Sequence, residues 1–85
     1  MTYYAAIDLH CNQSTLVMID QEDRQVFRER LPNNLEMILY SLSPYREQLY
    51  GLAVESTFNW YWLVDGLIDS GYRVELVQTS QVKKY

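Results

Sequence analysis

Two apolar segments that each carry an acidic residue at their end constrain the fold of this chain more than any other feature. The first, residues 3–9, contains Asp8 near its end, and the second, residues 50–54, is followed by Glu55. Residues 3–7 show no alternation of polar and apolar side chains, which is typical of a strand covered on both faces. A carboxylate at the end of such a strand has a desolvation cost, so Asp8 and Glu55 are the first candidates for a functional role.

The apolar pattern predicts five strands, at residues 3–9, 15–19, 25–31, 50–54 and 73–77. Residues 20–23 are all polar or acidic and predict a hairpin turn between the second and third strands, because such side chains bond their own backbone. Charged residues in the third strand favour a place at the edge of the sheet, where charge discourages unwanted pairing.

Two helices are predicted from apolar residues that recur at helical spacing. The first follows Asn34, which can cap it, and its apolar face consists of Leu35, Ile38, Leu39 and Leu42. Ser56 or Thr57 can cap the second helix, and Gly71 is placed to end it in a left-handed conformation. The apolar stripe of this second helix consists of Trp60, Leu63, Val64, Leu67 and Ile68.

The predicted order of elements is three strands, a helix, a strand, a helix and a strand. Three strands linked by hairpins and followed by right-handed crossovers give an α/β domain, with helices packed on a mixed sheet. The ribonuclease H-like fold uses this order, with the first strand central and the fourth strand parallel to it. We therefore expect Asp8 and Glu55 to emerge at the same edge of the sheet.

The composition limits the classes of function. The 85 residues predict one small domain, and with 48% apolar residues we expect it to be an oligomer or part of a larger protein. A net charge of -4 with seven basic residues argues against nucleic-acid binding by bulk electrostatics, so such contact needs metal ions or other segments. A single cysteine, together with no membrane-length apolar run and no signal peptide, predicts a cytoplasmic protein.

The two carboxylates suit metal-dependent phosphodiester chemistry. Such reactions are commonly assisted by two divalent ions about 3.5–4 Å apart, and Mg²⁺ prefers carboxylate oxygens. Asp8 and Glu55 at neighbouring strand ends could share such an ion. The alternative interpretation is that both are solvated strand-end residues. The adjacent His10 is interpreted as an exposed loop residue rather than a metal ligand.

Three segments resemble a known family. The sequences AIDLH at residues 6–10, VESTFNWYWLVD at residues 54–65 and GYRV at residues 71–74 are similar to the N-terminal part of DEDD transposases of the insertion-sequence one-ten family, relatives of the pilin-gene-inverting recombinases. The resemblance implies a RuvC-like catalytic domain in which four acidic residues bind Mg²⁺, with Asp8 and Glu55 in the first two positions. It also implies DNA as substrate, a guide RNA as partner and a serine nucleophile in a separate C-terminal domain.

The chain departs from the family pattern after Glu55. In the family the other two aspartates form a D-x-x-D motif a little beyond the position of Tyr85. No such motif follows Glu55 in this chain, and its later acidic residues are Asp65, Asp69 and Glu75. We therefore expect residues 1–85 to be the N-terminal part of a RuvC-like transposase domain, inactive alone and holding little Mg²⁺. A sheet without its remaining elements should expose apolar surface, which predicts a symmetric homodimer.

Two other functions stay open. One is a non-catalytic module from a truncated transposase gene that dimerises or binds an intact transposase. The other is the sugar-kinase and actin branch of the same fold, in which an aspartate at the end of the first strand faces nucleotide phosphates. The phosphate-binding hairpin of that branch normally contains glycine, and residues 8–15 contain none.

Overall fold

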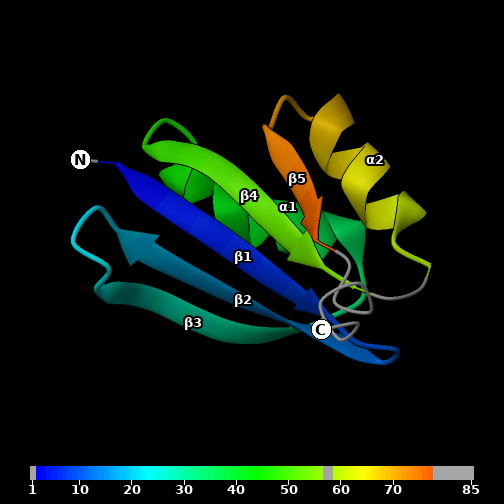
Figure 1. Ribbon diagram of the computed structural model, residues 1–85. Coiled ribbons are helices and arrows are strands. Elements are labelled where there is room, and N and C mark those ends of the chain that lie inside the picture. The colour runs from blue at the N-terminus through cyan, green and yellow to red at the C-terminus, as the bar shows by residue number, and fades with distance from the viewer. Residues whose placement is uncertain (1, 57–58, 78–85) are drawn as a thin grey trace, which may run out of the picture.

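The computed structural model describes residues 2–56 and 59–77 and contains the predicted elements in the predicted order (Figure 1). A short 3-10 helix, Ser43–Tyr45, follows the first helix. The helices are α1 (Leu35–Leu42) and α2 (Tyr61–Asp69). The strands are β1 (Tyr3–Leu9), β2 (Gln13–Asp20), β3 (Gln25–Pro32), β4 (Leu49–Glu55) and β5 (Val74–Val77).

The strands form one mixed sheet in the order β3-β2-β1-β4-β5. β1 lies at the centre, antiparallel to β2 and parallel to β4, and β5 is parallel to β4. The predicted α/β architecture, the central first strand and its parallel pairing with the fourth strand are confirmed. The predicted edge position of the charged strand β3 is also confirmed.

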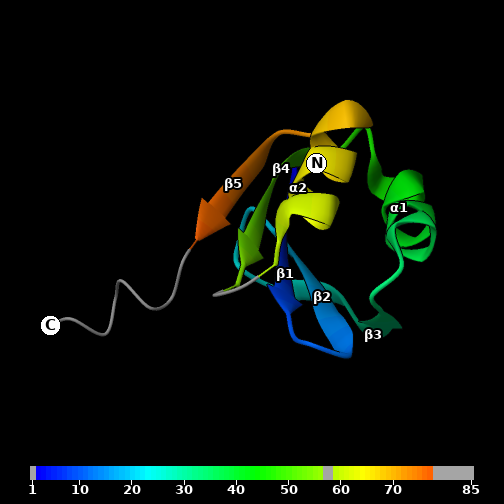
Figure 2. The ribbon, with the colours of Figure 1, turned by 90° about the vertical axis from the view of Figure 1, so that its right-hand side faces the viewer.

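Both helices pack on the same face of the sheet, and the opposite face carries no helix among the described residues (Figure 2). Side chains of β1 alternate between buried and exposed, so Ala5, Ile7 and Leu9 enter the core while Tyr4 is 41% exposed on the other face, here called the open face. The prediction that residues 3–7 are covered on both faces is therefore wrong for the described chain. Ala6 and Ala53 pair on the open face, and alanine in place of a polar residue at these two positions gives the two segments their continuous apolar character.

The N-termini of the two helices differ from each other. Asn34 caps α1 as predicted, and its Oδ1 accepts a hydrogen bond of 3.1 Å from the backbone N–H of Met37. The capping role predicted for Ser56 is wrong, because α2 begins later, after Trp60. Ser56 is buried, and its N–H donates to the Val77 carbonyl at the end of the sheet. Thr57 lies outside the described residues.

Gly71 terminates α2, as the sequence predicted. Gly71 has a φ of 94°, and the N–H groups of Gly71 and Tyr72 donate to the carbonyls of Ile68 and Leu67. This pair of bonds is a Schellman motif, which satisfies carbonyls at the end of the helix and requires glycine at the left-handed position. The predicted stripe is correct at Leu63, Val64 and Leu67, but Ile68 is 51% exposed. Neither helix within the described ranges has the length and apolar character needed to cross a membrane.

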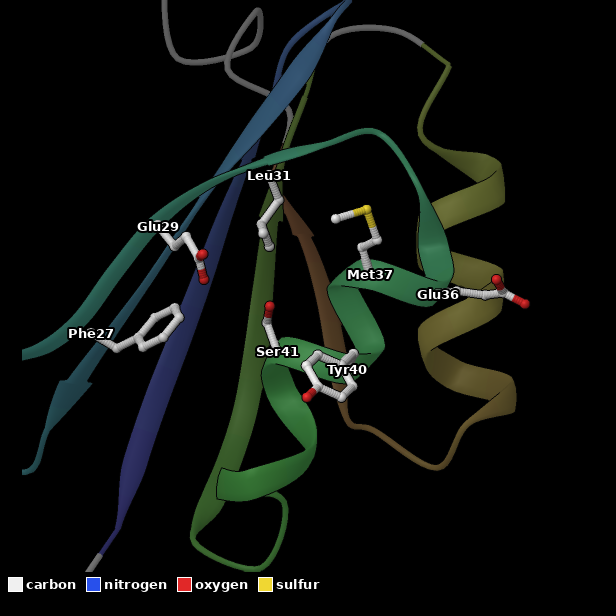
Figure 3. Close-up of a pocket in the computed structure, with 7 residues that line it drawn as sticks. All are labelled: Phe27, Glu29, Leu31, Glu36, Met37, Tyr40 and Ser41. Atoms are coloured by element: carbon white, nitrogen blue, oxygen red, sulfur yellow. The ribbon is translucent and has the colours of Figure 1, made fainter.

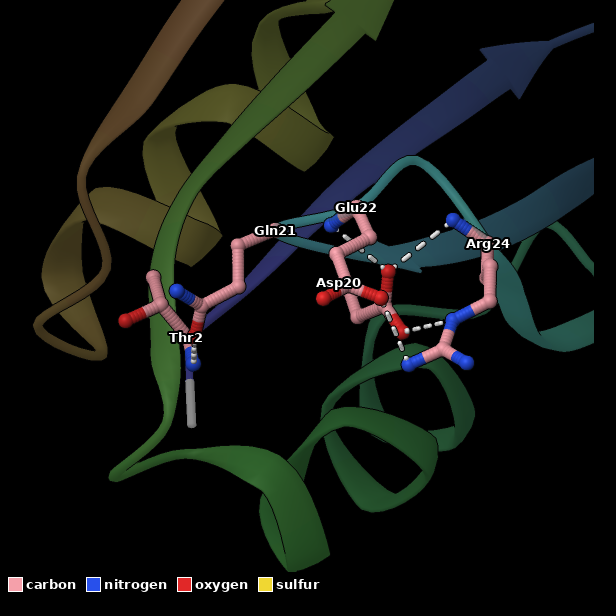
Figure 4. Close-up of polar contacts among 5 residues, drawn as sticks. All are labelled: Thr2, Asp20, Gln21, Glu22 and Arg24. Carbon is pink, nitrogen blue, oxygen red and sulfur yellow. Dashed lines mark hydrogen bonds and ion pairs between the residues drawn. The ribbon is translucent and has the colours of Figure 1, made fainter.

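Asp20 organises the hairpin between β2 and β3 (Figure 4). Its Oδ1 accepts hydrogen bonds of 2.9 Å from the backbone N–H groups of Glu22 and Arg24, and its Oδ2 lies 3.1 Å from Nε of Arg24. The backbone N–H of Arg24 is the main cause that holds the pKa of Asp20 below its usual value, against the opposing effect of burial. The predicted turn thus closes on its own acidic residue.

We expect Asp20→Asn to lower the thermal unfolding midpoint measured by circular dichroism. The pKa of Asp20 is lower in the folded chain than its unfolded value of about 3.9. The stabilisation that the ionised Asp20 gives the hairpin is therefore fully present at pH values above that unfolded pKa. It is lost as pH falls through the folded pKa, so the difference between wild type and variant should shrink in acid. Glu22→Gln is the control, since it removes one exposed ion pair with Arg24. If the midpoints of wild type and Asp20→Asn differ as much in acid as at neutral pH, the ionised Asp20 carboxylate is not the cause of the stabilisation.

Candidate functional site

Asp8 and Glu55 lie directly opposite each other at the carboxyl ends of two parallel strands. They are register partners in the pairing of β1 with β4, so their Cα atoms lie about 5 Å apart, the usual distance between neighbouring strands. Both side chains belong to the open face, one residue beyond the buried pair Ile7 and Val54. The expectation that both carboxylates emerge at the same edge of the sheet is confirmed.

His10 contacts Asp8 from the turn that follows β1. Its Nε2 lies 3.1 Å from Oδ2 of Asp8, and the side chains of His10 and Asp8 are 63% and 51% exposed. The predicted exposure of His10 is confirmed, whereas this contact was not predicted. A pair this exposed contributes little to stability, so its consequence is to place an imidazole beside one oxygen of Asp8.

The turn that carries His10 is anchored by Asn33, a residue of the connection between β3 and α1. Nδ2 of Asn33 donates to the His10 carbonyl at 2.7 Å, and Oδ1 of Asn33 accepts a 2.6 Å bond from the Ser14 hydroxyl. Ser14 is almost fully buried at the start of β2. The connection from β3 to α1 therefore fixes the position of the turn beside Asp8.

The donor atoms at this edge fit a hard divalent cation but do not complete a site for one. Asp8 and Glu55 offer carboxylate oxygens on the same face, which is the ligand chemistry that Mg²⁺ prefers. Among residues 2–56 and 59–77, no group of three or more His, Cys, Asp or Glu side chains is arranged to hold a metal ion. Asp65 and Asp69 lie on α2. Glu75 lies on β5 and pairs with Ala53, two residues before Glu55 on β4.

Two hollows border the third strand on opposite faces of the sheet. One, with a volume of about 460 Å³, lies between β3 and α1 and is mostly apolar (Figure 3). It is lined by Phe27, Glu29, Leu31, Glu36, Met37, Tyr40 and Ser41. Because α1 covers the face opposite the carboxylates, this groove is not part of their site. The second hollow, of about 330 Å³, adjoins the turn of His10 and is lined by Thr15 and Arg30 of the open face.

Comparison with known proteins identifies the fold. No family model and no curated protein matches the sequence. The structure is similar to T. thermophilus RuvC, solved in complex with a Holliday junction substrate, with a TM-score of 0.72, 16% identity and coverage of 99% of this chain and 69% of RuvC. It is also similar to a ROK family protein from Streptococcus pneumoniae in complex with sucrose, with a TM-score of 0.54, 17% identity and coverage of 91% and 34%. At these identities the likeness concerns the fold alone, which is RuvC-like and ribonuclease H-like as predicted.

Replacing Glu55 by Gln should stabilise the chain in the absence of divalent ions. Like charges opposite each other on neighbouring strands destabilise a sheet by about 0.2–1 kcal/mol, and the exposure of Asp8 favours the lower end of this range. The gain should appear in urea unfolding at low salt with EDTA and decrease at high salt, where charges are screened.

Glu47→Gln is the matched control, because it removes the same charge from an exposed turn. An equal gain from both variants would show that net charge, rather than the Asp8–Glu55 pair, causes the effect.

Proposed function

We propose that this chain is the N-terminal part of the RuvC-like catalytic domain of a DNA transposase or site-specific recombinase. The observation that carries the proposal is the parallel register of Asp8 and Glu55, whose side chains share the open face at one sheet edge. The resemblance of residues 6–10, 54–65 and 71–74 to DEDD transposases of the insertion-sequence one-ten family, in segments that include both carboxylates, supports it. In this assignment Asp8 and Glu55 are the first two acidic metal ligands.

The chemistry assigned to these residues is the positioning of charge around a phosphodiester. Asp8 and Glu55 would hold Mg²⁺, which, when bound, activates an attacking oxygen and stabilises a leaving oxygen. The sheet keeps both carboxylates at fixed strand ends, so little reorganisation is needed to bring them together. Two carboxylates give Mg²⁺ few ligands, so residues 1–85 alone should hold it weakly and lack activity.

The proposed substrate is DNA, and a guide RNA is proposed as a partner of the complete recombinase. RuvC, which shares this fold, was solved with a Holliday junction, a branched DNA substrate. With a net charge of -4, this chain needs local basic residues or metal ions to contact a phosphate backbone. We also propose that residues 1–85 form one incomplete catalytic domain and that the complete recombinase acts in the cytoplasm.

A nucleotide-phosphate function of the sugar-kinase type is not favoured. The turn between β1 and β2 would have to approach phosphates closely, and residues 10–12 of that turn are His10, Cys11 and Asn12. Side chains at all three positions oppose the close backbone approach that glycine permits.

Asp8→Ala and Glu55→Ala should each abolish transposition by the complete recombinase, because removing one carboxylate leaves the metal site with too few ligands. The measurement is transposition of a marked element in cells, with protein levels checked by immunoblot. Glu47→Ala should transpose like the wild type, since Glu47 lies in an exposed turn before β4. Normal transposition by either carboxylate variant would contradict the assignment.

The homodimer remains a second part of the proposal. The open face exposes apolar rings, with Tyr4 at 41% and Tyr50 at 58%, and their centroids lie 5.6 Å apart. We expect sedimentation equilibrium to detect a dimer and Tyr4→Lys to shift it towards monomer. Tyr40→Lys is the control, because Tyr40 is 81% exposed on the helix-covered side. A wild-type chain that stays monomeric at high concentration would contradict a dimer.

A further inference from the structure

Arg30 lies in the same cross-strand row as the two carboxylates. Arg30 pairs with Thr15, Thr15 pairs with Asp8, and Asp8 pairs with Glu55. Directly paired residues of neighbouring strands point to the same face, so this row belongs to the open face. At the usual strand spacing, the Cα of Arg30 is on the order of 10 Å from that of Asp8.

The hollow beside this row is lined by hydrogen-bond donors and contains no acidic residue. Its volume is about 330 Å³, and its lining consists of His10, Cys11, Asn12, Gln13, Thr15 and Arg30. In a chain with eleven acidic and seven basic residues, this lining has one guanidinium and no carboxylate, and the nearby Asp8 carboxylate contacts the His10 imidazole. Such a lining suits an anion of the size of a phosphate group.

The guanidinium of Arg30 is available for a ligand. Arg30 is exposed and forms no ion pair with any residue in the described part of the chain. Its neighbour Glu29 lines the groove with α1 on the other face of the sheet, as Figure 3 shows, so the alternation of the strand separates the two charges. Arg28, two residues earlier, pairs with Val17 and adds a second positive charge to the open face.

We propose that Arg30, assisted by Thr15 and Gln13, binds a backbone phosphate of the DNA strand on which Asp8 and Glu55 act; this inference rests on the proposed function. A guanidinium binds phosphate through two parallel N–H donors, and the hydroxyl and amide groups supply further donors. The contact offsets the repulsion between the strand and the two carboxylates. Arg30 thus positions the substrate at a phosphate next to the reacting one and takes no part in the reaction itself.

The test uses this chain and a fluorescently labelled single-stranded DNA oligonucleotide, with affinity measured by anisotropy over a range of salt concentrations in EDTA. Arg30→Gln should weaken binding about tenfold and reduce the slope of log affinity against log salt by about 0.7, the value for one phosphate contact. Arg30→Lys should keep the slope and recover part of the affinity, because it retains the charge without the planar donor pair.

Arg73→Gln is the matched control. It removes the same charge from the residue that precedes β5, at the opposite end of the sheet, where Arg73 lies over the Tyr50 ring. It should leave the affinity within about twofold of wild type, since Arg73 does not line the hollow. In ¹⁵N-edited NMR spectra, the oligonucleotide should shift the amides of Gln13, Thr15 and Arg30 in wild type and in Arg73→Gln.

Several results would overturn the inference. They are wild-type affinity and salt slope in Arg30→Gln, equal losses in Arg30→Gln and Arg73→Gln, and no binding by the wild-type chain. None of these outcomes decides the proposed function, because the transposition assay of Asp8→Ala and Glu55→Ala tests that function separately. Conversely, normal transposition by Asp8→Ala or Glu55→Ala would contradict the proposed function even if Arg30 were found to bind phosphate.

Discussion

The parallel pairing of β1 with β4 is the interaction on which the rest of the structure depends. It places β1 at the centre of the sheet, brings Ile7 against Val54 in the core and sets Asp8 opposite Glu55. Because side chains alternate along a strand, a shift of one residue would send one carboxylate into the core and its apolar neighbour to the surface. The burial of Ile7 and Val54, which are 1% and 0% exposed, therefore also fixes the relative position of the two acidic residues.

The difference between the two faces of the sheet explains how acidic residues are tolerated near a buried strand. The helix-covered face carries the fully buried apolar side chains, whereas the open face carries the exposed rings of Tyr4 and Tyr50, the small Ala6 and Ala53 and, at its carboxyl end, the two carboxylates. Asp8 is half exposed, so it keeps part of its hydration and needs no fully desolvated partner. On β3 the same alternation sends Glu29 towards α1 and Arg30 towards the open face.

Polar contacts between distant segments hold the edge of the sheet that bears the carboxylates. Asn33 joins the turn after β1 to the start of α1, and Asn34 caps that helix one residue later. The sequence showed two adjacent asparagines, but only one of their two roles is local. A cap bonds three residues away and can be predicted from sequence, whereas the bond from Asn33 to His10 spans 23 residues.

The sequence by itself determined the order of the strands and helices, the Asn34 cap, the glycine that ends α2 and the position of Asp8 and Glu55 at strand ends. These features depend on local periodicity and on the backbone preferences of single residues. The tertiary structure decided which face of the sheet is covered and made Ser56 bond to the end of the sheet instead of capping α2. It also decided how His10, Asn33 and Arg30 lie around the carboxylates. Those outcomes depend on pairing between residues far apart in the chain, and a run such as Ala5, Ala6 and Ile7 does not reveal which of its faces another element will cover.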